Sequence, residues 1–317
     1  MIFAQTLDPW RTLAALMLEA AIGYPDRLHQ ILPHPVTWAG DAISVLEARW
    51  NRTNRPPLHR RLLGVVTLML VAGAAALLGF FIDRWGSKNI WGVLATILIA
   101  TTGLAQRSLF THVAAVRDAL QTGNLPGARR AVGRIVGRDT EPLDESGIAA
   151  AALESLAESF CDGVIAPAFW LLLFGIAGLF AYKAINTADS IIGHREPRWR
   201  DFGWAAARTD DLFNLVPARL SGMLIALAAW GGWRVMLRDA HLHDSPNAGW
   251  PEAAMAGGLQ IRLGGPVRYD GAPHSRAWFG DGNPPGIADL ARGLRIYIIA
   301  CTLFWAALAA GGLAWRL

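Results

Sequence analysis

The sequence predicts an all-α fold: a polytopic integral membrane helix bundle with about five to seven membrane-embedded helices and cytoplasmic connecting segments. Three observations support this prediction. Hydrophobic residues make up 53% of the chain and charged residues 17%, whereas a typical soluble domain has about 25% charged residues. The apolar residues are gathered into long runs whose ends carry charges. Several of the 14 tryptophans flank these runs, as residues at a membrane interface do.

Five runs are candidate membrane spans, since a transmembrane helix needs about 20 predominantly apolar residues. The first run is uncharged from end to end, and the fourth is interrupted by Asn214 and Pro217. A sixth run, at residues 13–22, is short and contains Glu19, so it is marginal as a span. In chain order the five runs cover residues 62–82, 90–105, 164–182, 212–233 and 297–315.

Polar segments separate the runs, and their arginines indicate the topology. The positive-inside rule places residues 26–61 and 106–146 in the cytoplasm. Residues 183–211 return to that side only if residues 147–163 form a membrane-buried helix, which the sequence leaves open. We expect a single membrane-embedded domain over residues 1–317, with a Gly/Pro-rich polar loop segment at 234–295. The expected location is the cell inner membrane, as a multi-pass protein whose partner is the lipid bilayer.

Several classes of protein are disfavoured. The net charge of +4 comes from arginines spread among the polar segments, so no nucleic-acid-binding face is predicted. The two cysteines, Cys161 and Cys301, lie far apart in apolar surroundings and indicate neither a disulfide framework nor a zinc site. The chain lacks a GxxxxGK[ST] loop, a convincing GxSxG elbow and an HExxH helix, so any nucleotide site is of another kind.

The first group of residues with chemical potential is an acidic stripe. Glu154, Glu158 and Asp162 recur every four residues and therefore share one face of a helix. Like charges at this spacing repel unless a cation lies between them. Because carboxylates within a membrane are costly and usually functional, we interpret the stripe as part of a site. The alternative is a surface helix with a solvated acidic face.

The second group lies at the end of the third run. Lys183, Asn186 and Asp189 are three residues apart and align on one helix face. A cation, an amide and a carboxylate at a membrane boundary can bind phosphate and Mg²⁺ together. The alternative is a lysine that reaches toward the interface beside a helix cap.

The third group surrounds the fourth run. Asp210, Asp211 and Asn214 are plausible oxygen ligands for a hard cation, and Arg208 and Arg219 can neutralise phosphate or pair with the aspartates. The alternative is an ion-paired helix start. Arg219 lies inside an apolar run, where an unpaired charge costs roughly 2.5–3.5 kcal/mol, so it needs a partner. Farther on, the stretch that holds Asn247 and Glu252 predicts a structured turn that enters a short helix.

The order of these motifs resembles one known family over nearly the whole chain. The matching stretches are residues 34–36 (HPV), 136–140 (VGRDT), 152–158 (ALESLAE), 162–167 (DGVIAP), 182–190 (YKAINTADS), 207–211 (ARTDD), 217–220 (PARL) and 247–257 (NAGWPEAAMAG). The family is the cobinamide-phosphate synthases of cobalamin biosynthesis, which are membrane proteins. Two departures are Glu19, where an aspartate is expected, and Ser159-Phe160-Cys161, which replaces a more polar stretch.

The resemblance implies an ATP-dependent amide ligation, with ATP and Mg²⁺ as cofactors. A carboxylate of adenosylcobyric acid would be activated by ATP and attacked by the amine of aminopropanol phosphate or ethanolamine phosphate. Glu154, Glu158, Asp162, Lys183 and Asp210 are then the candidates for catalysis, with Glu158 as the proton acceptor. The candidates for binding the cofactor are Asn186, Asp189, Arg208, Asn214, Arg219, Asn247 and Glu252, and those for binding the metal are Asp210, Asp211 and Asp189.

Two other functions remain open from the residues. A membrane sensor or signalling protein of related fold would show no dependence on a nucleotide. A corrinoid transporter would suit the interrupted fourth run and would move its substrate unchanged. Other late cobalamin-pathway membrane enzymes or a second copy of the chain are expected partners. Because ATP is cytoplasmic, we expect Glu154, Lys183 and Asp210 to converge on the cytoplasmic side. The sequence does not choose the amino-alcohol phosphate or locate the nucleotide pocket.

Overall fold

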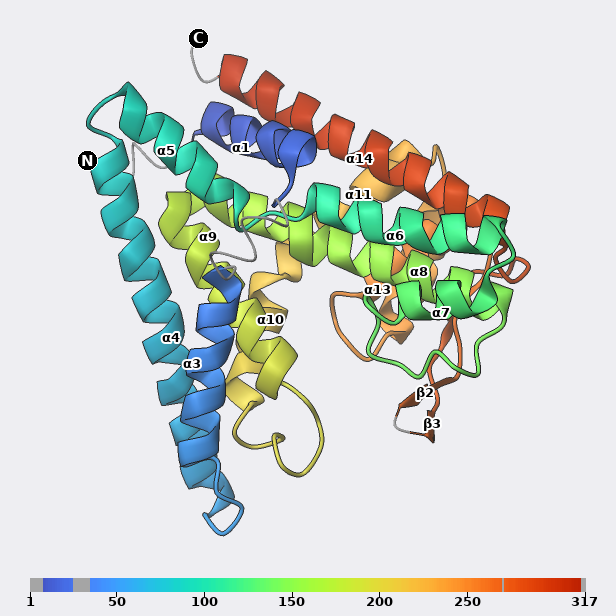
Figure 1. Ribbon diagram of the computed structural model, residues 1–317, viewed down its shortest axis with the longest axis horizontal. Helices are drawn as coiled ribbons and strands as arrows, with labels where there is room; N and C mark the ends of the chain where they lie inside the picture. Colours follow the sequence, from blue (N-terminus) through green and yellow to red (C-terminus); the bar gives the residue numbers. More distant parts are fainter. Residues whose placement is uncertain (1–7, 25–34, 270, 315–317) are drawn as a thin grey trace. The chain divides into compact units, whose positions relative to one another are not determined.

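The computed structural model describes residues 8–24, 35–269 and 271–314 (Figure 1). Among them almost every element is a helix, and the strands are short. The helices are α1 (Pro9–Ile22), α3 (Pro35–Trp50), α4 (Pro57–Gly86), α5 (Ile90–Thr101), α6 (Gln106–Gln121), α7 (Leu125–Val132), α8 (Glu145–Phe160), α9 (Ala166–Ile192), α10 (Trp204–Phe213), α11 (Leu215–Ala228), α12 (Trp233–Asp239), α13 (Gly249–Leu259) and α14 (Ile287–Ala314). A π-helix, η2 (Cys161–Ile165), and a 3₁₀ turn, η3 (Ala240–Leu242), complete them.

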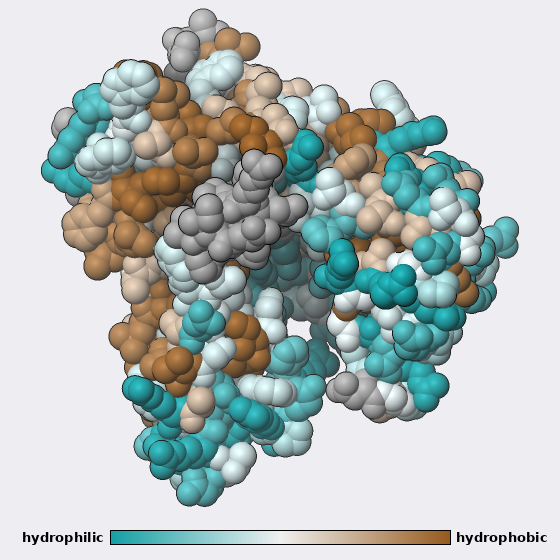
Figure 2. All heavy atoms as spheres, in the orientation of Figure 1, coloured by the Kyte–Doolittle hydropathy of each residue, from teal (hydrophilic) through white to brown (hydrophobic). Residues whose placement is uncertain are grey.

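The predicted membrane bundle is confirmed. By length and apolar composition, four helical stretches of the described residues can cross a membrane: Pro57–Gly86, Ile90–Gln121, Glu145–Ile192 and Ile287–Ala314. The broken pair α10 and α11 would make a fifth. These stretches cover the five predicted runs, whereas α1 has only 14 residues and is too short to span. Brown, hydrophobic atoms gather over α4 and α5 in Figure 2, where large apolar side chains are exposed, as lipid contact requires.

The chain divides into two compact units, each built from separated segments. Unit 1 comprises residues 1–105, 166–214 and 308–317, and unit 2 comprises residues 106–165 and 215–307. The predicted single membrane-embedded domain stays a prediction. The chain passes between the units four times, and neither unit is a continuous segment.

Unit 1 is organised by the packing of α3, α4, α9 and α10, which lie together in Figure 1. Small residues let the helix backbones approach closely, as in many membrane helix pairs. A Cβ on Gly79 would lie 2.6 Å from the Ala177 backbone. A Cβ on Gly64 would overlap the carbonyl oxygen of Phe202, a fully buried ring in the core of this unit. The core residues are Ile43, Leu68, Ile185, Ala188, Ile192, Phe202, Ala205 and Ala206.

Helix α9 is broken in its middle. Phe174 and Gly175 leave helical geometry, and Gly175 takes a φ of 65°, a left-handed conformation that costs other residues roughly 1–2 kcal/mol. The side chain of Asp83 on α4 lies beside the break, and its Oδ2 accepts a bond from the Ala177 N–H at 3.4 Å. This carboxylate therefore caps the second half of α9, where backbone donors lack intrahelical partners.

Unit 2 is organised around α8, which is buried on nearly all sides. Alanine occupies positions 149–152, so neighbouring elements approach its backbone closely. Helix α13 is buried almost as completely and packs against α8, α11 and α12. Two short antiparallel pairs cover this part of the unit, β1 (Leu263–Gly264) with β4 (Trp278–Phe279) and β2 (Val267–Tyr269) with β3 (Ala272–His274).

The segment 234–295 is more ordered than the predicted Gly/Pro-rich loop. It contains most of α12, all of α13, the four strands and the start of α14. Its glycines and alanines serve close packing rather than chain flexibility: a Cβ on Gly257 would lie 2.7 Å from Val235. The predicted turn into a short helix at 247–258 corresponds to α13. Of the motif at 34–36, His34 lies outside the described residues.

We expect Gly175→Ala to destabilise the protein by about 1–2 kcal/mol. The alanine would have to hold a positive φ, and its Cβ would lie 2.5 Å from Oδ2 of Asp83. Gly73→Ala in α4 is the matched control, since a Cβ there meets nothing within 4 Å. Thermal unfolding in detergent measures both. Equal melting temperatures for the two variants would contradict the cap described for α9.

Candidate functional site

Helices α8 and α13 each bury one glutamate at their contact. Glu154 is 2% exposed and Glu252 is 1% exposed. Both belong to helices of small apolar residues, so packing alone gives no reason for a charged side chain there. A buried carboxylate is strongly destabilising unless it is paired or protonated. Glu154 is paired with arginines, whereas the pKa of Glu252 is raised so that this carboxyl resists ionisation.

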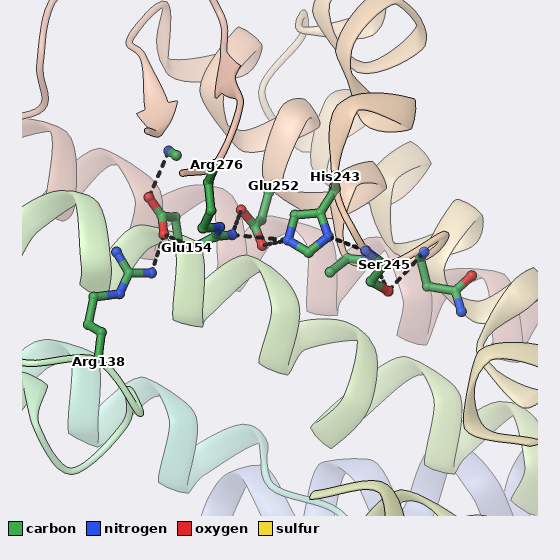
Figure 3. A network of polar contacts seen from close by, with 9 residues as sticks. Arg138, Glu154, His243, Ser245, Glu252 and Arg276 are labelled. Carbon is green, nitrogen blue, oxygen red and sulfur yellow. Dashed lines mark hydrogen bonds and ion pairs between the residues drawn. The ribbon is translucent and has the colours of Figure 1, made fainter. Parts of the chain in front are cut away.

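Glu154 is compensated by three donors (Figure 3). Arg138, which follows α7, forms an ion pair with Oε2. Arg276, between β3 and β4, places its Nη1 3.3 Å from the same oxygen. The backbone N–H of Gly264 donates to Oε1 at 2.8 Å. These contacts satisfy both oxygens of an ionised carboxylate and tie α8 to the loop before it and to the segment after α13.

Glu252 is compensated far less. Arg276 reaches Oε2 with its Nη2 at 3.4 Å, whereas Oε1 is buried and has no hydrogen-bond partner. Burial, together with the negative charges of Glu154 and Glu158, raises the pKa of Glu252 well above its usual value. This residue is therefore a carboxyl group that resists ionisation and has one oxygen available.

His243 approaches the available oxygen of Glu252. Its Nδ1 accepts a bond from the Ser245 N–H at 2.8 Å, while its Nε2 lies 3.5 Å from Glu252 Oε1 and 3.0 Å from Arg276 Nη2. Burial and the charge of Arg276 lower the pKa of His243 to about 4, so the ring is neutral at pH 7. Both ring nitrogens therefore face N–H donors, the Ser245 backbone at Nδ1 and the Arg276 guanidinium, which can only donate, at Nε2.

The network continues to the predicted residues Asn247 and Arg219. Ser245 Oγ accepts from the Asn247 N–H at 3.2 Å, and Asn247 Oδ1 accepts from Arg219 Nη1 at 3.1 Å. The Arg219 guanidinium also lies over the Trp250 ring, 4.8 Å from its centroid. The partners of Arg219 are thus the side-chain amide of Asn247 and the indole ring of Trp250. The suggested pairing of this arginine with the aspartates is not seen among its contacts.

Unit 1 holds a second polar cluster, around Asp210 at the end of α10. Asn186 Nδ2 donates to its Oδ1 at 3.2 Å, and Asn214 Nδ2 donates to its Oδ2 at 3.0 Å. Tyr182 donates its hydroxyl to Asn214 Oδ1 at 3.0 Å. Lys183 is near enough for its charge to act on Asp210. Residues of the second and third sequence groups therefore contact one another here.

The remaining predicted metal ligands, Asp211 and Asp189, have other neighbours as well. Asp211 forms an ion pair with Arg208 at 2.9 Å, and Asp189 lies beside Gly193 at the end of α9. Across the described residues, no group of three or more His, Cys, Asp or Glu side chains is arranged to hold a metal ion. Mg²⁺ is often bound by one or two carboxylates together with substrate phosphates. Asp210 is a buried carboxylate among neutral amides and fits that requirement. No ligand set beyond it is seen in the described residues, and the metal site stays a prediction.

Of the acidic stripe, only Glu154 is in the core of the network. Glu158 is exposed one turn later on α8, and its charge acts on Glu252 and Arg276. Asp162 lies in the π-helix η2 and is half-buried. Glu154 belongs to unit 2, whereas Lys183 and Asp210 belong to unit 1. The convergence of these three residues stays a prediction.

Four network members were not selected from the sequence: Arg138, His243, Ser245 and Arg276. Arg138 lies in the VGRDT stretch, where its family motif was a usable signal. The other three lie in the segment that was interpreted as a loop. There a histidine or an arginine is indistinguishable from a solvated side chain until α13 and the strands bring it against the buried glutamates.

Comparisons with known proteins agree on one family. Residues 12–297 match the family described as "CobD/Cbib protein". A protein of Rhodobacter capsulatus named "Cobalamin biosynthesis protein CobD" is 49% identical over 90% of this chain and 91% of its own. Proteins of the same name from a Sinorhizobium species and from Rhizobium meliloti are 45% and 41% identical, over 91% and 94% of this chain and 93% and 95% of theirs. No solved structure matches.

We expect Glu252→Gln to stabilise the protein, and more at pH 8 than at pH 5. The pKa of Glu252 is raised on folding, by burial first and then by Glu154 and Glu158. The stability associated with this group is therefore complete below its unfolded-state pKa of about 4.5 and is lost as the pH rises through the folded-state pKa. Glutamine has the same shape and no charge, so it escapes that loss. Melting temperatures in detergent across this range measure the difference.

Glu47→Gln on α3 is the control, because the pKa of Glu47 is lowered on folding whereas that of Glu252 is raised. Burial works against its ionisation, but bonds from Arg198 and Asn51 outweigh burial and lower the pKa of Glu47. Its ionised form stabilises the fold at both pH values, so this variant should lose stability at both. A Glu252→Gln advantage that stays constant or shrinks with rising pH would contradict a neutral Glu252.

Proposed function

The chain belongs to the CobD/Cbib protein family of cobalamin biosynthesis, and from this premise we propose that it is an ATP-dependent amide ligase. It joins the amine of aminopropanol phosphate or ethanolamine phosphate to a carboxylate of adenosylcobyric acid. The product is adenosylcobinamide phosphate. Membership in the family and the membrane helices support a membrane enzyme of this pathway. The buried network of unit 2 supports the reaction type.

The reaction has two steps with distinct requirements. The corrinoid carboxylate displaces ADP from the γ-phosphate of ATP and forms an acyl phosphate. The amine then attacks the acyl carbon, the amide C–N bond forms, and inorganic phosphate leaves. Negative charge must be neutralised on the transferring phosphoryl group, and the attacking ammonium must first lose a proton. The protein therefore needs cations, an accessible base and a fixed hydrogen-bond donor for the carbonyl oxygen.

The two carboxyl groups of unit 2 suit different parts of this chemistry. Glu252 resists ionisation, and its buried Oε1, 3.5 Å from His243 Nε2, has no hydrogen-bond partner, so as a neutral acid it can donate a hydrogen bond to a carbonyl oxygen that develops charge. Glu158, exposed on the next turn after Glu154, is the ionised carboxylate that takes the proton from the ammonium. Glu154 and Arg276 hold the network in place around them. The single observation that carries the proposal is the difference between Glu252, which is buried and resists ionisation, and Glu158, which is exposed.

The reaction also needs cations that neutralise phosphate. Lys183, Arg208 and Arg219 are the proposed cations, and the Arg219 guanidinium makes all its observed contacts with neutral groups. Mg²⁺, when bound, would neutralise phosphate charge beside Asp210, with Asp189 and Asp211 as further candidates. Asn186 and Asn214 position Asp210 for that role. We place the protein in the cell inner membrane, where ATP is available on the cytoplasmic face.

A corrinoid transporter is the competing function that the fold itself suggests. Helix α9 is broken at Gly175, and α10 is separated from α11 at Asn214. Broken helices at membrane depth are common in transporters. A transporter would leave the corrinoid chemically unchanged, as would a membrane sensor, so the mass of the corrinoid after incubation separates both from a ligase.

We expect the purified full-length protein to add one amino-alcohol phosphate to adenosylcobyric acid when MgATP is supplied. Glu158→Gln and Asp210→Asn should each lower the rate at least about 100-fold, the usual effect of losing acid–base or metal chemistry. Glu145→Gln is the matched control, an exposed carboxylate in the first turn of the same helix α8. The corrinoid mass, followed over time in detergent, measures all four proteins.

Two outcomes would contradict the ligase. The first is folded protein that leaves the corrinoid mass unchanged with both amines; uptake into proteoliposomes would then identify a transporter. The second is product that forms in the absence of a nucleotide, which would exclude ATP-driven activation. Product formation that survives in Glu158→Gln at the control rate would keep the ligase and reject Glu158 as its base.

A further inference from the structure

A polar pocket of about 790 Å³ lies in unit 2, outside the buried network. It is formed by two segments that are more than a hundred residues apart, the loop after α7 and the β2–β3 hairpin. Its volume falls in the range of roughly 300–1,000 Å³ that is typical of small-molecule sites. Hydrophilic atoms gather over this part of unit 2 in Figure 2. The pocket therefore opens to water rather than to lipid.

The two walls of the pocket are joined by backbone contacts. The Asp139 N–H donates to the Arg268 carbonyl at 2.9 Å, and the Gly271 N–H donates to Asp139 Oδ2 at 2.8 Å. The Asp139 carboxylate is thereby engaged with the hairpin backbone, although it also lines the pocket. Both contacts fix the hairpin against the loop, so the pocket is built before any ligand arrives.

Glycine exposes the backbone on both walls. A Cβ added to Gly137 or to Gly271 would meet no atom within 4 Å, and both residues line the pocket. A bound group can therefore approach the main chain at these positions, which is how glycine-containing loops admit phosphate oxygens. The φ of Gly137 is not positive, so other residues can take its conformation.

The pocket presents a cation that no carboxylate neutralises. Arg268 is exposed, and its Nη2 donates to the neutral Gly271 carbonyl at 3.0 Å. Within the described ranges, no acidic side chain forms an ion pair with it. The opposite wall carries Arg138, whose guanidinium is paired with Glu154. Glu141 also lines the pocket but is exposed at its rim, where its side chain can remain in water.

We propose that this pocket binds a phosphoryl group, with Arg268 as its principal cation and the backbone at Gly137 as its cradle. The proposal rests on the proposed function, because both ATP and the amino-alcohol phosphate carry phosphate. Arg138 connects the pocket to the Glu154 network, so a phosphoryl group bound here lies beside the groups to which we assign the chemistry. A guanidinium with free donors is the side chain best suited to phosphate.

Binding to the full-length protein in detergent tests the proposal, with MgADP and aminopropanol phosphate as separate probes and adenosine as the phosphate-free control. Arg268→Ala removes the cation, and Gly137→Leu fills the pocket from a position where its Cβ meets no protein atom. Each should weaken the binding of one of the two phosphate probes at least about tenfold. The probe that is affected identifies the ligand. Calorimetric titration measures the dissociation constants.

Two matched controls should bind as the native protein does. Arg262→Ala removes an exposed arginine of the same segment, one that lies over Trp278 at 5.0 Å and is outside the pocket. Gly286→Leu adds the same side chain at another glycine whose Cβ meets nothing within 4 Å. Arg268→Lys should recover part of the affinity because it restores the charge. Melting temperatures establish that every variant is folded.

Turnover measured in parallel separates this proposal from the ligase. If the corrinoid product forms and the pocket variants bind both probes like their controls, the pocket proposal is wrong and the ligase stands. If binding is lost in the pocket variants but the native protein makes no product, the pocket stands and the ligase is wrong. Native protein that binds neither phosphate probe, or that binds adenosine as tightly as MgADP, overturns the pocket proposal.

Discussion

The structure of unit 2 depends on Arg276, which bridges the two buried glutamates. An unpaired charge between α8 and α13 would cost several kcal/mol, so Glu154 can be buried only if guanidinium groups come to it. One of them arrives from the loop after α7 as Arg138 and the other from the strand segment as Arg276. The strands, the hairpin and its pocket thus occupy their places because a carboxylate on a central helix needs partners. Glu252, with only one weak contact to the same arginine, stays neutral instead.

Glu154 is ion-paired, whereas Glu252 resists ionisation. This difference between two buried carboxyl groups connects the fold with the proposed chemistry. A protein that needed only stability could fill the contact between α8 and α13 with leucine, since replacing buried ion pairs by apolar residues is often neutral or stabilising. The network instead runs from the pocket at Arg138 through His243 and Ser245 to Arg219. In unit 1, Asp210 is likewise surrounded by amides and a tyrosine rather than by apolar side chains.

Much of the fold could be predicted from the sequence because bilayer thickness sets the length of an apolar run. The break in α9 could not, since Gly175 is one glycine among several in apolar helices and its cap, Asp83, is remote in the chain. The order of segment 234–295 was also missed. Glycine and proline lower the local helix preference of α13, and this helix packs against α8, α11 and α12.

The candidate site was predictable where a polar residue interrupts an apolar helix, as Glu154 and Glu252 do. It was not predictable where the polar residue lies in a polar segment, as His243 and Arg276 do, because their burial is a property of the tertiary fold. Asp211 and Asp162 show that spacing on a helix alone does not place a side chain in the buried cluster: Asp211 is paired with Arg208, and Asp162 lies half-buried in the π-helix η2. Tertiary packing decides which members of a motif meet.

The most direct test of the central claim is to neutralise the network and compare stability with activity. The variant combines Arg138→Gln, Glu154→Gln, Glu252→Gln and Arg276→Gln, which keeps hydrogen-bonding groups and removes the charges of the two buried glutamates and of the two arginines that contact them. If the network exists for chemistry, the variant melts at or above the native temperature and makes no adenosylcobinamide phosphate from adenosylcobyric acid, amino-alcohol phosphate and MgATP. A variant that ligates at the native rate, or that no longer folds, would contradict the account.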